Sequence, residues 1–210
     1  MPKLPRTPPS VEALREIGPD IYAFSGGESL LRIYSRGGDY PCEWGSFRRF
    51  GPVNARFDHH PAPAQLHREH GIYYAALELT TCLAETFQDT RIISLSRRSP
   101  WLVMFAPTRT LNLLDLTGSW PTRVGASMKI NTGPRSITRA WSRHFYMAFP
   151  EVDGLYYASS MHAHRPCVAL YERAMASMPV APQFRCALHD PVLLGDVKRS
   201  AAAIGYKVIP

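Results

Sequence analysis

Residues 71–87, GIYYAALELTTCLAETF, restrict the possible folds of this chain more than any other segment. The first part is aromatic, β-branched and small, which is typical of a buried strand over residues 72–77. Apolar residues then follow the i, i+3, i+4 spacing of a helix with one buried face, at Leu79, Cys82, Leu83 and Phe87. The segment therefore predicts a strand that leads directly into a helix. Glu85 lies away from the apolar face, and from this segment alone we interpret it as a solvated surface glutamate.

The rest of the chain mixes strands and helices without regular alternation. Apolar runs predict further strands, over residues 29–35, 101–106, 111–116, 154–158, 167–171, 192–194 and 206–209. Helical spacing or helix-end signals predict helices over residues 11–17, 136–148 and 196–204. Ser10 is placed to cap the first of these helices. The pattern argues for an α+β protein with a mostly antiparallel sheet and peripheral helices.

The composition fits one globular domain with a short appendage. The chain has 210 residues, and its 24 basic against 17 acidic residues give a net charge of +7. Such a charge suits an anionic partner, whether a nucleotide, a nucleic acid or an acidic protein. No apolar run is long enough for a membrane span, and the N-terminus lacks the apolar core of a secretory signal. We therefore expect a cytoplasmic protein, with residues 1–9 mobile.

Familiar cofactor and metal motifs are absent. The sequence has no GxGxxG, no P-loop, no HExxH and no GxSxG, which argues against standard dehydrogenases, phosphoryl-transfer enzymes and serine hydrolases. No C-x-x-C pair occurs, and Cys82 and Cys167 lie in apolar segments where they would pack as small hydrophobes. The histidines are clustered, at His59, His60, His67 and His70 and again at His162 and His164. They lack the spacing of a zinc site, so we expect ordinary surface histidines and no metal.

Five short motifs, taken in order, resemble the RES-domain family, which is named for arginine, glutamate and serine. They are Arg32 in LLRIYS, Arg56 in NARFD, Tyr74 and Ala76 at the end of a strand, Thr81 and Glu85 in the next helix, and Ser159 in DGLYYASS. Ala55 stands where the family usually has glycine, and Cys82 where it usually has alanine. Ser160 is adjacent to Ser159, so the position of the serine carries an uncertainty of one residue.

The resemblance implies a fold, a domain division and an activity. The fold is ADP-ribosyltransferase-like, with two packed sheets, in a catalytic domain of residues 29–210 that follows an N-terminal extension of residues 1–28. The activity is NAD⁺ degradation by hydrolysis or phosphorolysis of the nicotinamide–ribose bond, often by the toxin of a toxin–antitoxin pair. NAD⁺ would then be the substrate, a cognate antitoxin the possible protein partner, and no metal would be needed.

The same residues suit the chemistry of NAD⁺. Guanidinium groups match phosphate oxygens, so Arg32 and Arg56 would bind the pyrophosphate. Tyr74 would stack on or orient the nicotinamide, and Ser159 would fix its ribose or amide. Glu85 would stabilise the oxocarbenium-like charge that develops when the bond breaks.

Each of these residues also has an interpretation in which it serves only the structure. Arg32 could form an internal salt bridge, even with Glu85, and Arg56 could lie on a solvated edge. Tyr74 could be a core residue, and Ser159 could be hydrogen-bonded locally.

Two other functions remain open at this point. The first is ADP-ribosylation of a protein, which differs from NAD⁺ degradation only in the group that attacks. The second is non-catalytic binding of nucleic acid, which the net charge and the arginines of residues 36–56 would suit. No helix-turn-helix, zinc-finger or RNP motif occurs, which argues against it.

Overall fold

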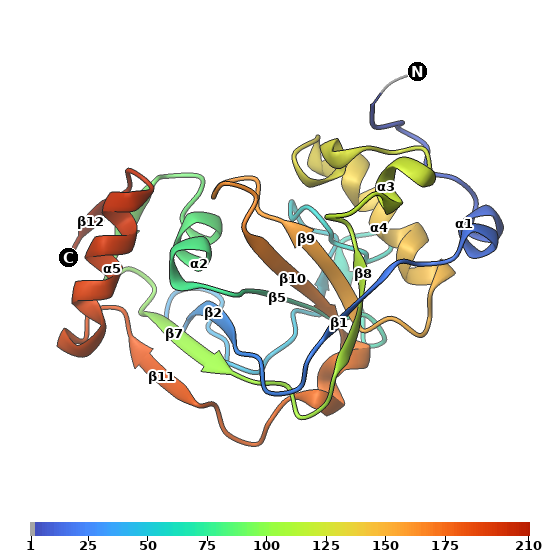
Figure 1. The fold of residues 1–210 in the computed structure, drawn as a ribbon. Coiled ribbons are helices and arrows are strands. Elements are labelled where there is room, and N and C mark those ends of the chain that lie inside the picture. The colour runs from blue at the N-terminus through green and yellow to red at the C-terminus, as the bar shows by residue number, and fades with distance from the viewer. Residues whose placement is uncertain (1–2) are drawn as a thin grey trace.

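The computed structural model describes residues 3–210 and forms one mixed α+β unit (Figure 1). The strands are β1 (Ile21–Phe24), β2 (Leu30–Ser35), β3 (Phe50–Gly51), β4 (Gln65–Leu66), β5 (Ile72–Ala76), β6 (Ile92–Ser94), β7 (Pro100–Phe105), β8 (Leu111–Asp115), β9 (Gly154–Ala158), β10 (Pro166–Tyr171), β11 (Phe184–Ala187) and β12 (Lys207–Ile209). The helices are α1 (Val11–Ile17), α2 (Leu79–Thr86), α3 (Trp120–Arg123), α4 (Arg135–Ala148), α5 (Pro191–Ala203) and two 3-10 helices, η1 (Met128–Asn131) and η2 (Glu172–Ser177). No helix among these residues is long and apolar enough to cross a membrane.

Eight strands form the main sheet, in the order β1-β8-β9-β10-β5-β2-β7-β11. All pairs are antiparallel except β8 with β9, which confirms the predicted class. At its centre, β2 pairs with β5 through Leu31 and Ala76 alone, whereas β2 pairs with β7 along its whole length. The two halves then pack against each other through an apolar core that includes Leu30 and Phe105 from one half and Leu113 and Val168 from the other. The two packed sheets implied by the resemblance are thus halves of one curved sheet.

Helices cover the two ends of this sheet (Figure 1). At one end, α1, α3 and α4 lie together, and α4 buries Trp141 and Phe145 against the sheet. At the other end, α5 packs against α2 and buries Leu193 and Val197. Helix α2 therefore lies between α5 and the centre of the sheet, in direct continuation of β5, as the sequence predicts.

One strand prediction is wrong. The apolar run at residues 192–194 predicts a strand, but these residues lie in the first turn of α5. The Asp190 side chain accepts a hydrogen bond from the Val192 amide, and Pro191 occupies the first helical position. This cap and the proline start a helix, so they outweigh the strand propensity of Val192.

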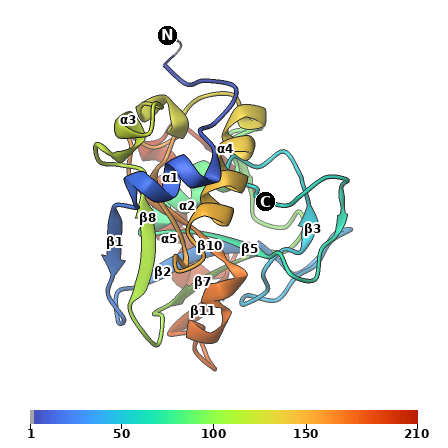
Figure 2. The ribbon, with the colours of Figure 1, turned by 90° about the vertical axis from the view of Figure 1, so that its right-hand side faces the viewer.

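The N-terminal segment is part of the fold. Leu4 is buried in the core, and the Pro5 carbonyl accepts a hydrogen bond from the Trp141 indole at 2.9 Å. Helix α1 packs on α4 (Figure 2), and β1 is the edge strand beside β8. The expected mobility of residues 1–9 is therefore wrong where Leu4 and Pro5 pack; Met1 and Pro2 lie outside the described residues.

Candidate active site

A cavity of about 390 Å³ opens where β2 and β5 separate. Its lining comes from both strands, from α2, from the segment at residues 54–56, from the start of α4, and from β9 and β10. The lining side chains include Arg32, Arg56, Tyr74 and Glu85, four of the five residues that the sequence singled out. The fold thus gathers segments more than a hundred residues apart around one cavity.

Glu85 lies in the last turn of α2 and is half-buried, so it is not the fully solvated surface residue that its helix suggests. Its Oε1 accepts a hydrogen bond from the Ser159 hydroxyl at 2.5 Å. Ser159 directly follows β9, so this contact ties the carboxylate to the sheet. The interaction fixes the orientation of the only carboxylate that the sequence assigned to the site.

The Ser159 side chain itself is buried, with 1% of its surface exposed. Its Oγ accepts hydrogen bonds from the amides of Met161, at 3.1 Å, and His162, at 3.0 Å, while its proton is donated to Glu85. A hydroxyl has one proton and two lone pairs, so this group is fully used within the protein. The neighbouring Ser160, rather than Ser159, lines the cavity.

Arg56 lies in the cavity wall and not on a solvated edge. Its guanidinium donates to the Gly133 carbonyl at 2.5 Å and to the Ser160 hydroxyl at 3.4 Å. Burial lowers the pKa of Arg56, the Glu85 charge raises it, and the Arg135 charge lowers it further. Its positive charge is therefore only partly compensated, which favours a bound anion.

Arg32 has a different environment from the one expected. Its Nη1 donates to the Ser46 carbonyl at 2.8 Å, and the guanidinium lies 4.1 Å from the centre of the Tyr73 ring. Among residues 3–210, no carboxylate forms an ion pair with it, so the alternative of a salt bridge to Glu85 does not hold. Arg32 anchors the loop before β3 while also lining the cavity.

Tyr74 stands on β5 and is half-buried. Its hydroxyl is buried without a hydrogen-bond partner in the described chain, and burial raises its pKa. The hydroxyls of Tyr34 and Tyr171 share this state, so the ring of Tyr74 is the part that can meet a ligand in the cavity. The ring lines the cavity beside Ile72 and Ala76.

Two arginines of the cavity were not predicted. Arg48 forms an ion pair with the buried Asp58 at 3.0 Å, and Arg135 is the first residue of α4 and donates to the Gln88 side chain at 2.6 Å. Arg135 does have a signal in the sequence. Basic residues are unfavourable in the first turn of a helix, and this turn carries no acidic residue at all. An arginine in that position, directly after Gly133 and Pro134, suggests an anion nearby.

The histidines near residue 60 are not surface residues. His59 and His60 are buried, with 1% and 0% of their surface exposed, and the rings of His59 and His70 have centres 5.5 Å apart. The His60 Nδ1 lies 2.6 Å from the Asp58 carboxylate, and His59 stacks on Tyr146. The prediction failed because this proline-containing loop is polar, yet it folds beneath α4 and η2. No group of metal-ligating side chains is found among residues 3–210.

The fold and the cavity together define an α+β protein with a mostly antiparallel sheet and an arginine-rich pocket that holds the Glu85 carboxylate. The profile of the RES domain matches residues 29–189, and the chain therefore belongs to the RES-domain family. This confirms the resemblance seen in the sequence. Among solved structures, the fold is similar to that of the MbcT toxin in the crystal structure of the M. tuberculosis MbcT–MbcA toxin–antitoxin complex. The TM-score is 0.58 at 17% identity, over 90% of this chain and 96% of that chain. No curated protein matches the sequence.

Proposed function

We propose that this protein is an NAD⁺-consuming enzyme that cleaves the nicotinamide–ribose bond. The observation that carries the proposal is the Glu85 carboxylate, oriented by Ser159 in a cavity whose other charges are mainly arginines. Bond cleavage creates positive charge at the anomeric carbon of the ribose. A fixed carboxylate beside that carbon lowers the barrier because its interaction strengthens in the transition state.

The charges of the cavity support a substrate with two phosphates. Four arginines line it, at positions 32, 48, 56 and 135, against two carboxylates, Glu85 and Asp89. Because Arg48 is paired with Asp58, three arginines are left to interact with a pyrophosphate. The cavity volume lies within the usual range for small-molecule sites.

The remaining residues then take distinct roles. Arg56 and Arg135 bind the pyrophosphate, and Arg32 contributes to the same anion site while it holds the 44–46 loop in place. Tyr74, whose side chain lines the cavity, stacks on the nicotinamide or orients it. Ser159 acts through Glu85, and Ser160 is the serine that can contact the ribose. No metal is required, since nicotinamide is a good leaving group.

The family also suggests a biological setting. The solved structure with a similar fold is that of a toxin–antitoxin complex. We therefore propose that this chain is a toxin with a cognate antitoxin protein as its partner. Coexpression tests this setting: the chain alone should arrest growth and deplete cellular NAD⁺, and an antitoxin should restore both.

The biochemical test is to incubate the purified protein with NAD⁺, with and without inorganic phosphate, and to identify the products. ADP-ribose indicates hydrolysis, and a phosphorylated ADP-ribose indicates phosphorolysis. When the NAD⁺ carries a label on its ADP-ribose part, label retained on protein indicates protein ADP-ribosylation. Release of nicotinamide in any arm supports the proposal. Intact NAD⁺ in every arm, with folded protein, would refute it.

Replacing Arg135 by Ala should raise the KM for NAD⁺ about tenfold and change kcat less than threefold. Loss of a charge-assisted phosphate contact weakens substrate and transition state equally, which appears in KM. Arg139→Ala is the matched control: Arg139 lies one turn later on α4, bonds to the Val53 carbonyl at 3.1 Å and does not line the cavity. Equal kinetic effects of the two replacements would contradict the assignment of Arg135.

A further inference from the structure

A second polar cluster stands beside the Glu85–Ser159 pair, at the start of α2. Glu78 occupies the N-cap of this helix, yet its side chain makes no capping hydrogen bond. Its Oε1 instead accepts a hydrogen bond from the buried Thr81 hydroxyl at 2.9 Å. The same oxygen lies 3.1 Å from the His162 Nδ1, which is also 2.8 Å from the Thr81 Oγ1.

The contacts among Glu78, Thr81 and His162 indicate which of these side chains donate a proton and which accept one. The single proton of the Thr81 hydroxyl is donated to Glu78, so Thr81 and Glu78 both present acceptors to the His162 Nδ1. We therefore assign the proton of the His162 ring to Nδ1, which donates it to this pair of oxygens. His162 is thus fixed to the start of α2 by its side chain.

His162 is also fixed to Ser159 by its backbone. Its amide donates to the Ser159 Oγ at 3.0 Å, and its carbonyl accepts from the Arg165 amide at 2.8 Å. The turn between them holds Ala163 and His164 at φ 43° and 58°, a left-handed conformation that is strained for residues other than glycine. Such a turn persists only when its surroundings hold it. Two of its side chains reach the Glu78 Oε1, the His162 Nδ1 at 3.1 Å and the more exposed Arg165 Nε at 3.8 Å, so His162 is the closer anchor.

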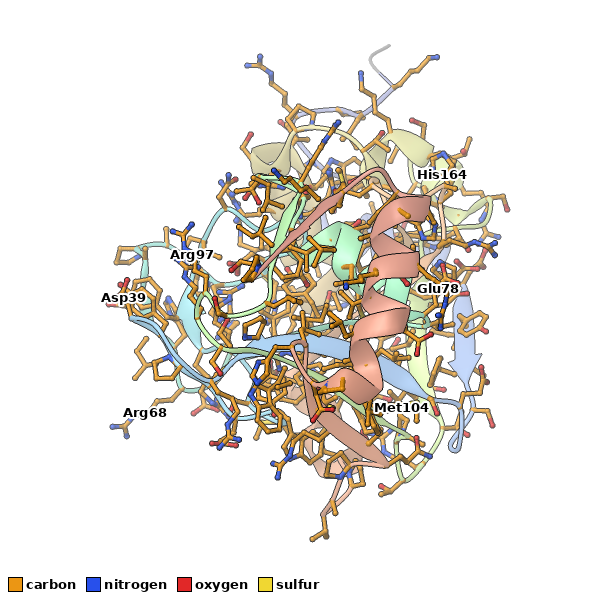
Figure 3. All side chains as sticks on the ribbon, turned by 90° about the vertical axis from the view of Figure 1, so that its left-hand side faces the viewer. Asp39, Arg68, Glu78, Arg97, Met104 and His164 are labelled. Carbon is orange, nitrogen blue, oxygen red and sulfur yellow. The ribbon has the colours of Figure 1, made fainter. Side chains whose placement is uncertain are left out.

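We infer that His162 is a positioning residue, which holds the β9–β10 turn so that Ser159 presents its proton to Glu85. The path runs from Glu78 and Thr81 through His162 and Ser159 to the carboxylate, so both ends of α2 are linked through one turn. His162 does not line the cavity, so we assign it no direct contact with the substrate. In Figure 3, Glu78 and His164 both lie to the right of α5, on the opposite side from Arg97 and Asp39.

The kinetic part of this inference rests on the proposed function. We expect His162→Ala to lower kcat about tenfold with KM within twofold, because a small misplacement of a catalytic group costs rate rather than affinity. His162→Asn should restore most of the rate, since its amide N–H can replace the Nδ1–H. His164→Asn is the matched control, because His164 is exposed and Asn tolerates the left-handed conformation. Similar kcat values for the wild type and His162→Ala, or for the Ala and Asn variants, would overturn the inference.

A second measurement separates this inference from the proposed function. Amide hydrogen exchange at Met161 and His162 reports whether their bonds to the Ser159 Oγ are kept. We expect about tenfold faster exchange at Met161 in His162→Ala and wild-type rates at both amides in His164→Asn. Unchanged exchange at Met161 would refute the positioning role whether or not the protein consumes NAD⁺. If the wild-type protein leaves NAD⁺ intact but exchange responds as expected, the proposed function fails and the positioning of Glu85 stands.

Discussion

Replacing Glu85 by Gln should lower the rate of NAD⁺ consumption about a hundredfold or more and leave a folded protein that still binds NAD⁺. The glutamine keeps the size of the side chain and an oxygen that can accept the Ser159 proton. It removes the negative charge, which is the property that strengthens binding to the transition state. The expected loss therefore falls on kcat, measured by initial rates at saturating NAD⁺.

Stability provides the internal check on this variant. The charge-assisted bond from Ser159 becomes a neutral one, which costs about 1 kcal/mol of the free energy of unfolding. Asp89→Asn is the matched control, since Asp89 is the other carboxylate of the cavity and is exposed. Its rate should stay within a few-fold of wild type. Normal NAD⁺ consumption by Glu85→Gln would refute both the site assignment and the proposed reaction.

Lowering the pH from 7.5 to 5 should reduce the free energy of unfolding by about 2 kcal/mol through His59 alone. Burial lowers the pKa of His59 from 6.5 to about 4, although Glu172 opposes this shift, and the neighbouring His60 and His70 add to it. Between these two pH values the unfolded chain binds a proton that the folded chain does not. Stability is therefore complete above pH 6.5 and is lost as the pH falls towards 4.

The variant that tests this is His59→Phe, which keeps the aromatic contacts with Tyr146 and Tyr171. We expect its stability difference between pH 7.5 and 5 to be about 2 kcal/mol smaller than that of the wild type, by urea unfolding at both pH values. Burial raises the pKa of the nearby Asp58 and Glu172, but hydrogen bonds outweigh this and lower both below their ordinary values of 3.8 and 4.5. Glu172 loses its contact with His59 in this variant and keeps the hydrogen bonds from the Tyr146 hydroxyl and the Gly71 amide, which also lower its pKa. An equal pH dependence in both proteins would contradict the role of His59.

The parts of the fold that follow from short-range patterns could be predicted. The β5–α2 unit is one example, because alternation, helical spacing and the order of the two elements all lie within residues 71–87. The class of the sheet also followed, since strands without regular βαβ alternation rarely form a parallel sheet. Residues 192–194 show the limit: three apolar residues fit a strand or a buried helix turn, and the cap at Asp190 decides.

The sequence singled out four residues that line one cavity, but it did not predict their contacts. Glu85, Arg56 and Tyr74 line the cavity, but the guanidinium of Arg32 turns to the carbonyls of a loop that has no sequence signature. The choice between Ser159 and Ser160 depends on the residue at which β9 ends, and a shift of that end by one residue would exchange the two serines. Burial of His59 could not be foreseen, because it results from packing against η2 and α4, far away in the sequence.

The bonding of the Ser159 hydroxyl has a consequence for chemical probes. Its lone pairs accept hydrogen bonds from the backbone amides of Met161 and His162, and its proton is donated to the Glu85 carboxylate. The residue is almost fully buried. An electrophile that labels activated serines, such as a fluorophosphonate, needs a free lone pair and access to the oxygen, and Ser159 offers neither. Reagents that modify guanidinium groups, such as phenylglyoxal, match what the cavity exposes in Arg56 and Arg135. The inhibitor chemistry suited to this pocket is therefore that of anion mimics, not that of serine traps.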